Sequence, residues 1–427
     1  MLRYRGGGRS FRHPHPDRMT HRFRPAPWLI LACGFLGFTA SLAQPLATFE
    51  AAYTGDVVAN LRGGNRTGVV YRDLFDATLR LNMEQALGWP RTNLYLHTIG
   101  TQGGYPSRLA GDLQGINNIE APTSWQLYEA WLQYIVADQR LSILAGLYDL
   151  NTEFDFIQTA SLFINSSHGM GPDFSQSGRN GPSTYPFTAL GVRFRWLATQ
   201  AWYVQGAVLE GVPGDPNHPR GTHVLLEPGE GALFVAETGW FFGGTTTEAQ
   251  GGVLRRRVSR LGTSSFDARL ALGGWVYTAP FERLDRPGQE ATSRGAYVLG
   301  EWKPESGHSV LGRMAFFGRF GVASARVNRL GWYLGAGAVI QGPTTGRRDD
   351  LLGVAVASAH NGGPFRRARE RLGQPVERAE TTLELTYLAT LSDHVAVQGD
   401  VQYVINPDTN PDRPNALVYG LRLLLNL

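Results

Sequence analysis

The chain has 427 residues, of which 42% are hydrophobic and only 18% charged, with 53 glycines and a formal net charge of +4. Residues 1–43 hold seven of the 40 basic residues and one of the 36 acidic ones, so the rest of the chain carries 33 basic and 35 acidic side chains. The basic isoelectric point therefore comes partly from the first segment, and the composition gives no support for nucleic-acid binding.

Residues 1–43 have the features of a secretory signal peptide. A basic stretch precedes the apolar run from Trp28 to Phe38, and small residues up to Ala43 form a cleavage motif. Met19 is an alternative start of translation. An uncleaved membrane anchor is the other interpretation, but the apolar run is shorter than a full helical span. The single cysteine, Cys33, lies in this segment, so the cleaved chain would have no disulfide.

After a short N-terminal segment at 44–54, apolar and polar residues alternate along the chain. Near the C-terminus, apolar residues occupy every second position from Leu417 to Leu425. Many such runs reach about ten residues, the length that a tilted membrane strand needs, whereas a soluble sandwich shows the same alternation over shorter strands. No later window holds 18 consecutive apolar residues. We therefore predict that residues 55–427 form one all-β, transmembrane, antiparallel barrel.

The alternating runs predict about 16 strands, an even number as in bacterial single-chain barrels. They are placed near 55–61, 74–84, 93–101, 126–135, 141–149, 189–197, 201–210, 233–242, 266–277, 295–302, 310–320, 331–341, 350–360, 379–391, 394–404 and 416–426. Short turns alternate with long connections at 102–125, 150–188, 211–232, 278–294, 361–378 and 405–415. This parity predicts external long loops and periplasmic termini, and only the long segment 243–265 departs from it. The glycine- and proline-rich segment 150–188 is long enough to fold into the lumen as a constriction loop.

Several segments resemble one known family. They are Gly111–Ala121, Leu127–Trp131, Leu150–Asp155 and Tyr185–Arg193, and the similarity extends from about Gly55 to the C-terminus. They are similar to the OprB family of carbohydrate-selective porins. The resemblance implies a sixteen-stranded outer-membrane channel for sugars, without indicating which sugar.

Sugar passage requires aromatic faces for the C–H side of a pyranose and charged or amide groups for its hydroxyls. Alternation places Glu129, Trp131 and Gln133 toward the lumen and Tyr128 toward lipid, and it also points Arg313 inward. The candidate sugar-binding or constriction residues are Arg80, Asn82, Glu129, Trp131, Asp149, Asn151, Glu153, Asp155, Arg193, Arg195, Glu237, Arg269 and Trp275. For each of them, an ordinary wet lumen residue that never contacts sugar is the competing interpretation.

Two charged clusters have their own alternatives. Asp149, Glu153 and Asp155 could form a calcium site, but the spacing of a calcium loop is missing, so anchoring of the inward loop to barrel-wall arginines is favoured. The arginine-rich run at 366–371 lies in an external loop by parity. It either contacts lipopolysaccharide phosphates or is a solvated charged loop.

Catalytic motifs are missing from the sequence: there is no Gly-x-Ser-x-Gly, His-Glu-x-x-His or phosphate-binding loop. A lipase-like barrel enzyme remains an alternative, with Ser166, Ser167 and His168 as the compact candidates. The sequence predicts a passive sugar porin without cofactor or bound metal, and a general or anion-preferring porin is the alternative. Expected partners are sugars, outer-membrane lipids and lipopolysaccharide, in a monomer or homotrimer located in the outer membrane.

Overall fold

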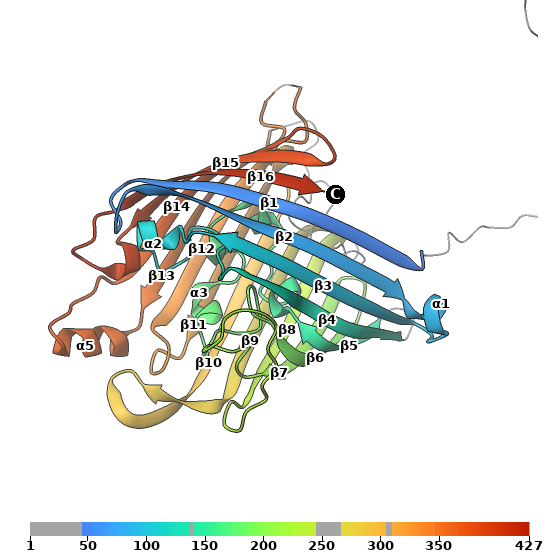
Figure 1. Cartoon of the computed structure of the whole chain (residues 1–427), viewed down its shortest axis with the longest axis horizontal. Helices are drawn as coiled ribbons and strands as arrows, with labels where there is room; N and C mark the ends of the chain where they lie inside the picture. Colours follow the sequence, from blue (N-terminus) through green and yellow to red (C-terminus); the bar gives the residue numbers. More distant parts are fainter. Residues whose placement is uncertain (1–44, 137–139, 245–265, 305–309, 345, 427) are drawn as a thin grey trace, which may run out of the picture. The chain divides into compact units, whose positions relative to one another are not determined.

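A computed structural model describes residues 45–136, 140–244, 266–304, 310–344 and 346–426. The described residues form sixteen strands in a closed barrel (Figure 1). Every strand pairs antiparallel with its neighbours in sequence, and β1 closes the ring by pairing with β16. The predicted fold class is therefore confirmed.

The strands are β1 (Ala47–Arg62), β2 (Gly68–Asn82), β3 (Thr92–Gly103), β4 (Ser124–Val136), β5 (Leu141–Tyr148), β6 (Ala189–Leu197), β7 (Trp202–Glu210), β8 (Ala232–Gly244), β9 (Phe266–Arg283), β10 (Arg286–Trp302), β11 (Met314–Ala323), β12 (Leu330–Gln341), β13 (Leu351–Asn361), β14 (Ala379–Thr390), β15 (Val395–Ile405) and β16 (Ala416–Asn426). The helices used below are α1 (Met83–Leu87), α2 (Ser107–Ala110), α3 (Pro172–Ser175) and α5 (Gly363–Arg371), with the short 3₁₀ turns η1 (Leu150–Thr152), η2 (Thr159–Leu162), η3 (Ser166–His168) and η5 (Leu311–Arg313).

Several predicted boundaries are wrong, and two regions differ most. β1 begins at Ala47 instead of Gly55, so most of the expected N-terminal segment belongs to the barrel. The predicted loop 278–294 is mostly strand, because β9 and β10 continue to a two-residue turn at Leu284 and Asp285. Pro280 reads as a loop signal in the sequence, but it lies where the β9–β10 register shifts, and a bulge tolerates the missing N–H. The unusual segment 243–265 lies almost wholly outside the described residues.

The outer surface of the barrel is apolar and its inner surface is polar. On β16, for example, Leu421 and Leu423 are exposed while Arg422 between them is buried inside. This is the alternation that a barrel in lipid requires. None of the described helices is long and apolar enough to span a membrane.

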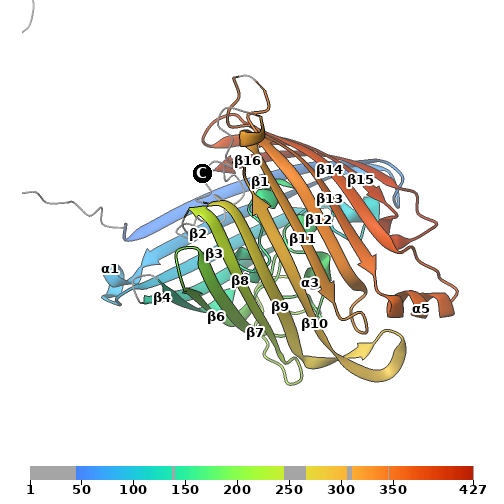
Figure 2. The ribbon, with the colours of Figure 1, turned by 180° about the vertical axis from the view of Figure 1, so that it is seen from behind.

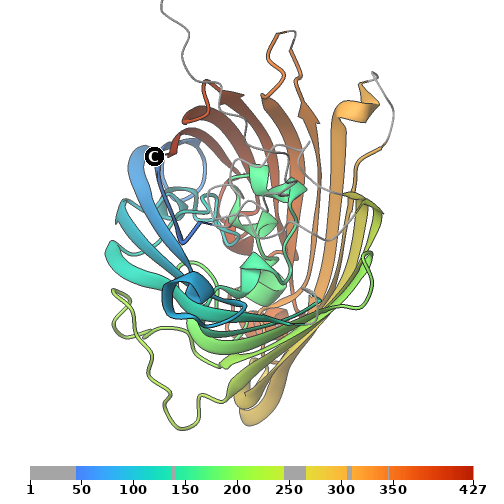
Figure 3. The same cartoon turned by 90° about the vertical axis from the view of Figure 1, so that its right-hand side faces the viewer.

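Two connections fold back into the barrel, which we call L2 (residues 104–123) and L3 (residues 149–188). Figure 3 shows the short helical turns of L3 surrounded by the ring of strands. L3 therefore lies where the sequence places it. L2 differs from its prediction as an external loop, because Ile116 and Ile119 are about 1% and 0% exposed and lie in apolar clusters with barrel-wall residues.

Candidate functional site

The central part of L3 is attached to the barrel wall by one arginine. Arg319 on β11 donates to Asp155 at 2.9 and 2.7 Å, and it also donates to Asp173 at the start of α3. All three side chains are buried. A guanidinium matches two carboxylates through its fixed fork of donors, so this contact fixes the position of both loop segments at once.

A second attachment lies on β8 and β9. Glu237 accepts a hydrogen bond from the backbone N–H of Asp155 at 3.0 Å and one from the Tyr203 hydroxyl at 2.6 Å. Arg269 donates to the carbonyl of Phe156 at 2.8 Å and to the Tyr203 oxygen at 2.6 Å. Both charged side chains therefore hold L3 and are buried beneath it.

The first turn of L3 is held by β6. Arg193 donates to the two oxygens of Glu153 at 2.7 and 3.1 Å, and the Tyr148 hydroxyl donates to the same carboxylate at 2.6 Å. The predicted anchoring of the loop carboxylates to wall arginines is thus observed for Glu153 and Asp155. No cluster of three or more potential metal ligands occurs among the described residues.

Wall glutamates complete the attachment of L3 by accepting its backbone N–H groups. Glu301 on β10 accepts from the N–H of Thr159 at 2.8 Å, and Glu384 on β14 accepts from the N–H of Ile164 at 2.6 Å. Short turns such as η2 leave N–H groups without helical partners, and buried carboxylates satisfy them here. L3 therefore follows the wall from β5 to β14.

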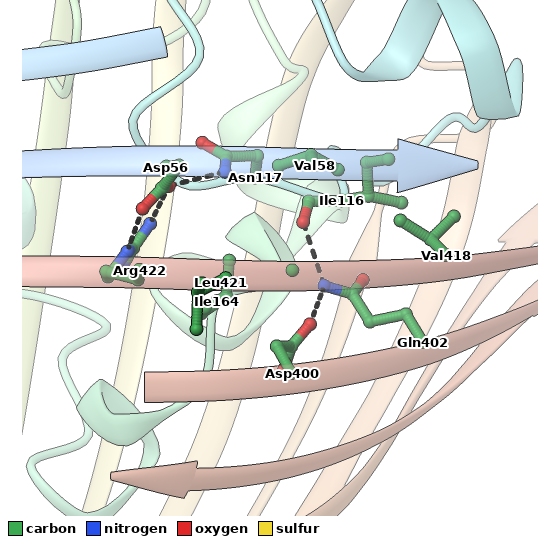
Figure 4. Close-up of a pocket in the computed structure, with 11 residues that line it drawn as sticks. Asp56, Val58, Ile116, Asn117, Ile164, Asp400, Gln402, Val418, Leu421 and Arg422 are labelled. Carbon is green, nitrogen blue, oxygen red and sulfur yellow. Dashed lines mark hydrogen bonds and ion pairs between the residues drawn. The ribbon is translucent and has the colours of Figure 1, made fainter. Parts of the chain in front are cut away.

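L2 is attached to the part of the wall where the barrel closes (Figure 4). Arg422 on β16 donates to both oxygens of Asp56 on β1, at 2.8 and 2.7 Å. Asp56 also accepts from Asn117 of L2 at 2.6 Å, and Arg422 donates to Asn118 at 2.8 Å. A cavity of about 10 Å³ beside this cluster has room for roughly one water molecule.

Arg72 on β2 closes the base of L2. It donates to the carbonyl of Gly104 at 2.7 Å and to that of Ala121 at 2.9 Å, near the two ends of the loop. The two loops are also joined directly, since the N–H of Asn118 donates to the carbonyl of Ile164 at 2.9 Å. Displacement of either loop would therefore disturb the other.

Burial shifts the pKa of several loop groups. It raises the pKa of Asp155 to about 6, although Arg319 opposes the shift. It raises the pKa of Asp112 in L2 to about 6, and the charge of Glu120 adds to that effect. Burial lowers the pKa of His168 to about 3, so this imidazole is neutral at physiological pH.

Comparison with known proteins is consistent with this architecture. The family model described as "Carbohydrate-selective porin, OprB family" matches residues 66–427. The chain belongs to the OprB family of carbohydrate-selective porins. Porin B of Pseudomonas aeruginosa is 23% identical over 416 residues, which cover 88% of this chain and 86% of that protein. Family and fold are those of a sugar channel of the outer membrane rather than of an enzyme.

Solved structures share the fold. A high-pH structure of Pseudomonas putida OprB aligns with a TM-score of 0.74 and 19% identity, covering 89% of this chain and 94% of that one. A low-pH structure of the same protein aligns with a TM-score of 0.54 and 17% identity, covering 89% and 92%. The channel DcaP of Acinetobacter baumannii aligns with a TM-score of 0.52 and 8% identity, covering 89% and 97%.

Within this porin the sequence-derived candidates divide into two groups by exposure. The buried ones belong to the loop attachments or pack beneath L3: Glu129, Asp155, Arg193, Glu237, Arg269 and Trp275. The partly exposed ones are Arg80, Asn82, Trp131, Asp149, Asn151, Glu153 and Arg195. Of this second group, Asn82 caps α1 and Asp149 caps η1. Only part of the predicted set is therefore available to a solute.

An aromatic stack occupies the inner face of β3 and β4. The Trp131 ring stacks on Tyr95 with centroids 4.7 Å apart, and the Arg80 guanidinium lies 5.7 Å from the centre of the Tyr95 ring. The Trp131 indole nitrogen donates to Glu129 at 3.2 Å. Arg195 on β6 is partly exposed, 3.6 Å from Glu153.

Two orientations differ from those predicted, and one residue that points inward as predicted is covered by L3. Tyr128 faces inward and donates to Asp149 at 2.7 Å, because the β3–β4 register skips it in a bulge that turns its side chain to the inner face. Arg313 is exposed in η5, ahead of β11, instead of pointing into the lumen. Trp275 points inward as predicted, but it is 3% exposed and stacks on Phe174 of L3, so L3 covers it.

Three of the attaching arginines were not predicted from the sequence: Arg72, Arg319 and Arg422. Arg319 and Arg422 lie in the interior of strands with few other polar residues, which is the signal that could have identified them. The strand β2 around Arg72 carries several other polar residues, so this signal is missing there. The lipase candidates do not form a catalytic pair. Neither ring nitrogen of His168 has a hydrogen-bond partner among the described residues, and Ser167 donates to Gln114.

Proposed function

We propose that this porin lets small, uncharged sugars diffuse passively past L2 and L3, after removal of residues 1–43 and insertion of the barrel into the outer membrane. The observation that carries the proposal is the attachment of both loops to the wall. L3 follows β5 to β14 and L2 lies against β1 and β16, so the inner faces of β2, β4 and β6 keep partly exposed polar and aromatic side chains.

Those side chains suit a sugar. Trp131 offers an aromatic surface for the C–H side of a pyranose ring, while Arg80 and Arg195 provide donors for its hydroxyls and Glu153 an acceptor. The loop anchors limit movement of the loops, so the channel should discriminate by size. We propose Arg80, Trp131, Glu153 and Arg195 as the residues that contact the passing solute.

Swelling of liposomes containing the purified porin tests this function. Isotonic glucose should enter faster than maltose or maltotriose, and faster than an uncharged non-sugar solute matched to glucose in size. Liposomes without protein are the control for leakage. Equal rates for glucose and the matched non-sugar solute would refute sugar selectivity and leave a general diffusion channel.

An anion-preferring channel is the second candidate, because two arginines, Arg80 and Arg195, are among the partly exposed inner residues. Ion selectivity measured in planar bilayers under a potassium chloride gradient separates the two proposals. A reversal potential near zero together with current block by glucose supports the sugar channel. A strong chloride preference without block by glucose supports the alternative.

A further inference from the structure

The hairpin of β9 and β10 continues past the neighbouring strands at the external end of the barrel and bends toward the β11–β12 connection and α5 (Figure 1). The N–H of Leu284 at the tip donates to the carbonyl of Arg326 at 2.9 Å, while the carbonyl of Arg294 accepts from Ser324 at 2.8 Å. These two hydrogen bonds join a long stretch of chain to a short one. The hairpin advances ten residues from Leu284 to Arg294, which is about 33 Å of extended chain, whereas the opposite connection advances two residues from Ser324 to Arg326, which is about 7 Å. The arm of the hairpin must therefore bow between these two attachments, and Figure 2 shows it curling toward α5.

A cavity of about 1150 Å³ lies beneath the bowed arm, somewhat larger than a typical ligand pocket. Its lining includes Val276, Ala296 and Val322. Val276 follows Trp275, whose ring packs on L3 inside the barrel, so Val276 faces the opposite, lipid side. Val276 and Val322 are 37% and 41% exposed, as expected for that side. The cavity thus has an apolar floor continuous with the membrane-facing surface.

The walls of the same cavity are basic. Arg294 and Arg326 line it and are exposed, with Glu290 as the single opposing carboxylate. The N-terminal end of α5 contributes Pro364 to the lining, and Arg367 and Arg371 of this helix contact Asp285 at the hairpin tip at 3.5 and 3.1 Å.

The helix α5 has no buried residue, and four of its nine residues are arginines. A short helix without an apolar face receives little stabilisation from packing, and isolated helices of this length are marginal in water. Contact with an anionic surface would neutralise its charges. A basic rim above an apolar floor matches one class of ligand, a lipid with phosphate groups above its acyl chains.

The neighbouring strands place this rim at the membrane–water boundary. On the outer face of β13 and β14, exposed Val354, Leu383 and Leu385 give way toward the external end to Ser358 and His360, whose side chains are hydrogen-bonded to each other. The arginines of α5 follow directly after β13. They therefore lie at the level of the lipid phosphates.

We propose that the cavity beneath the β9–β10 hairpin binds one lipopolysaccharide molecule of the outer leaflet. Its acyl chains lie on Val276, Ala296 and Val322, and its phosphates contact Arg294 and Arg326. Bound lipid would fill the space under the hairpin and fix α5 against the membrane. This site is separate from the sugar path, because Val276 and Val322 face away from L3 and because Trp275, which also lines the cavity, is covered by Phe174 on its inner side.

The test measures binding of purified lipopolysaccharide to the detergent-solubilised porin. Reversing both cavity charges, Arg294→Glu with Arg326→Glu, should weaken the apparent Kd at least tenfold, since each contact is a charge-assisted hydrogen bond. The control pair, Arg62→Glu with Arg66→Glu, makes the same charge change at exposed external positions near the β1–β2 turn and should alter the Kd less than twofold. Equal losses in the two pairs would reduce the proposal to non-specific charge attraction and overturn it.

Two further measurements locate the site and identify the ligand. Ala296→Trp fills the apolar floor of the cavity without changing its charge and should also abolish lipopolysaccharide binding. Heat-modifiable gel mobility shows that the barrel of this variant is folded. Retained binding by the folded variant would refute the location of the site. Dephosphorylated lipopolysaccharide should bind the wild type at least tenfold more weakly, and equal binding would refute phosphate recognition. Displacement of bound lipopolysaccharide by inorganic phosphate at a matched concentration would refute a contribution of the acyl chains to binding. Glucose-driven swelling should be unchanged in these variants, so failure here is distinguishable from failure of the proposed sugar channel.

Discussion

Replacement of Arg319 by methionine tests whether the attachment of L3 determines what the channel passes. The variant removes the guanidinium that donates to Asp155 and Asp173 and leaves two buried carboxylates without a cation, with the N–H of Gly171 still donating to Asp155 at 3.4 Å. Removing one partner of a buried ion pair typically costs about 3–5 kcal/mol. That cost shifts the equilibrium between attached and detached L3 by a factor of roughly 10²–10⁴ toward the detached state.

The expected result is a larger, noisier single-channel conductance and a reduced preference for glucose over maltotriose in liposome swelling. The attachments at Glu301 and Glu384 remain, so only the segment around Asp155 and Asp173 should move. Arg348→Met, at an exposed periplasmic position, is the matched control and should behave as wild type. A folded Arg319→Met barrel with wild-type conductance and wild-type size preference would refute the reasoning.

Three further predictions concern the sugar path, the pH response and L2. Trp131→Ala should raise the half-blocking glucose concentration several-fold, because stacking of sugar on the indole is expected to contribute about 1 kcal/mol. The control Tyr95→Phe should leave the half-blocking concentration unchanged. Equal values for wild type and Trp131→Ala would remove Trp131 from the sugar path. Burial raises the pKa of Asp155 to about 6, so the Asp155 carboxyl binds its proton more tightly when L3 is attached than when L3 is released. Lowering the pH from 7 to 5 should therefore strengthen the attachment of L3 and reduce the current noise. Asp155→Asn should lose this pH response, and a response that persists in the variant would assign it to another group. Arg72→Lys cannot bridge the carbonyls at both ends of L2, so external trypsin should cleave after the exposed Arg108 of L2 several-fold faster. Unchanged cleavage would contradict that role.

The strands were predictable because side-chain alternation is a local property with a period of two residues. A run such as Leu417–Leu425 carries this signal without reference to the rest of the fold. Local exceptions are harder to predict. The bulge at Tyr128 shifts one side chain to the inner face, and its cause lies in the pairing with β3, which the sequence of β4 does not contain.

The loop attachments were predictable only in kind. Glu153 and Asp155 lie at the start of a long loop, which suggests anchoring, but the partner of Asp155 is 164 residues away on β11. The prediction for L2 was wrong because the alternation of short and long connections indicates only the side of the membrane on which a loop begins. It does not indicate whether the loop then folds back into the barrel. Ile116 and Ile119 were a usable signal, since two isoleucines in a nominally solvated loop need a surface to pack against.

Buried charge in the anchors sets the geometry of the channel more than the stability of the barrel. Before L2 and L3 enter, the interior of a barrel is wet, and charged inner residues such as Arg319 and Glu237 are compatible with it. Once the loops are in place, these groups are desolvated, and the attraction within each pair largely offsets that cost. Apolar contacts would tolerate sliding of the loops, whereas a guanidinium bound to two carboxylates permits a single register. The L3 anchors do not cross the β1–β16 closure of the strand ladder, so substitutions at the L3 anchors should change solute selectivity before they change the thermal stability of the barrel.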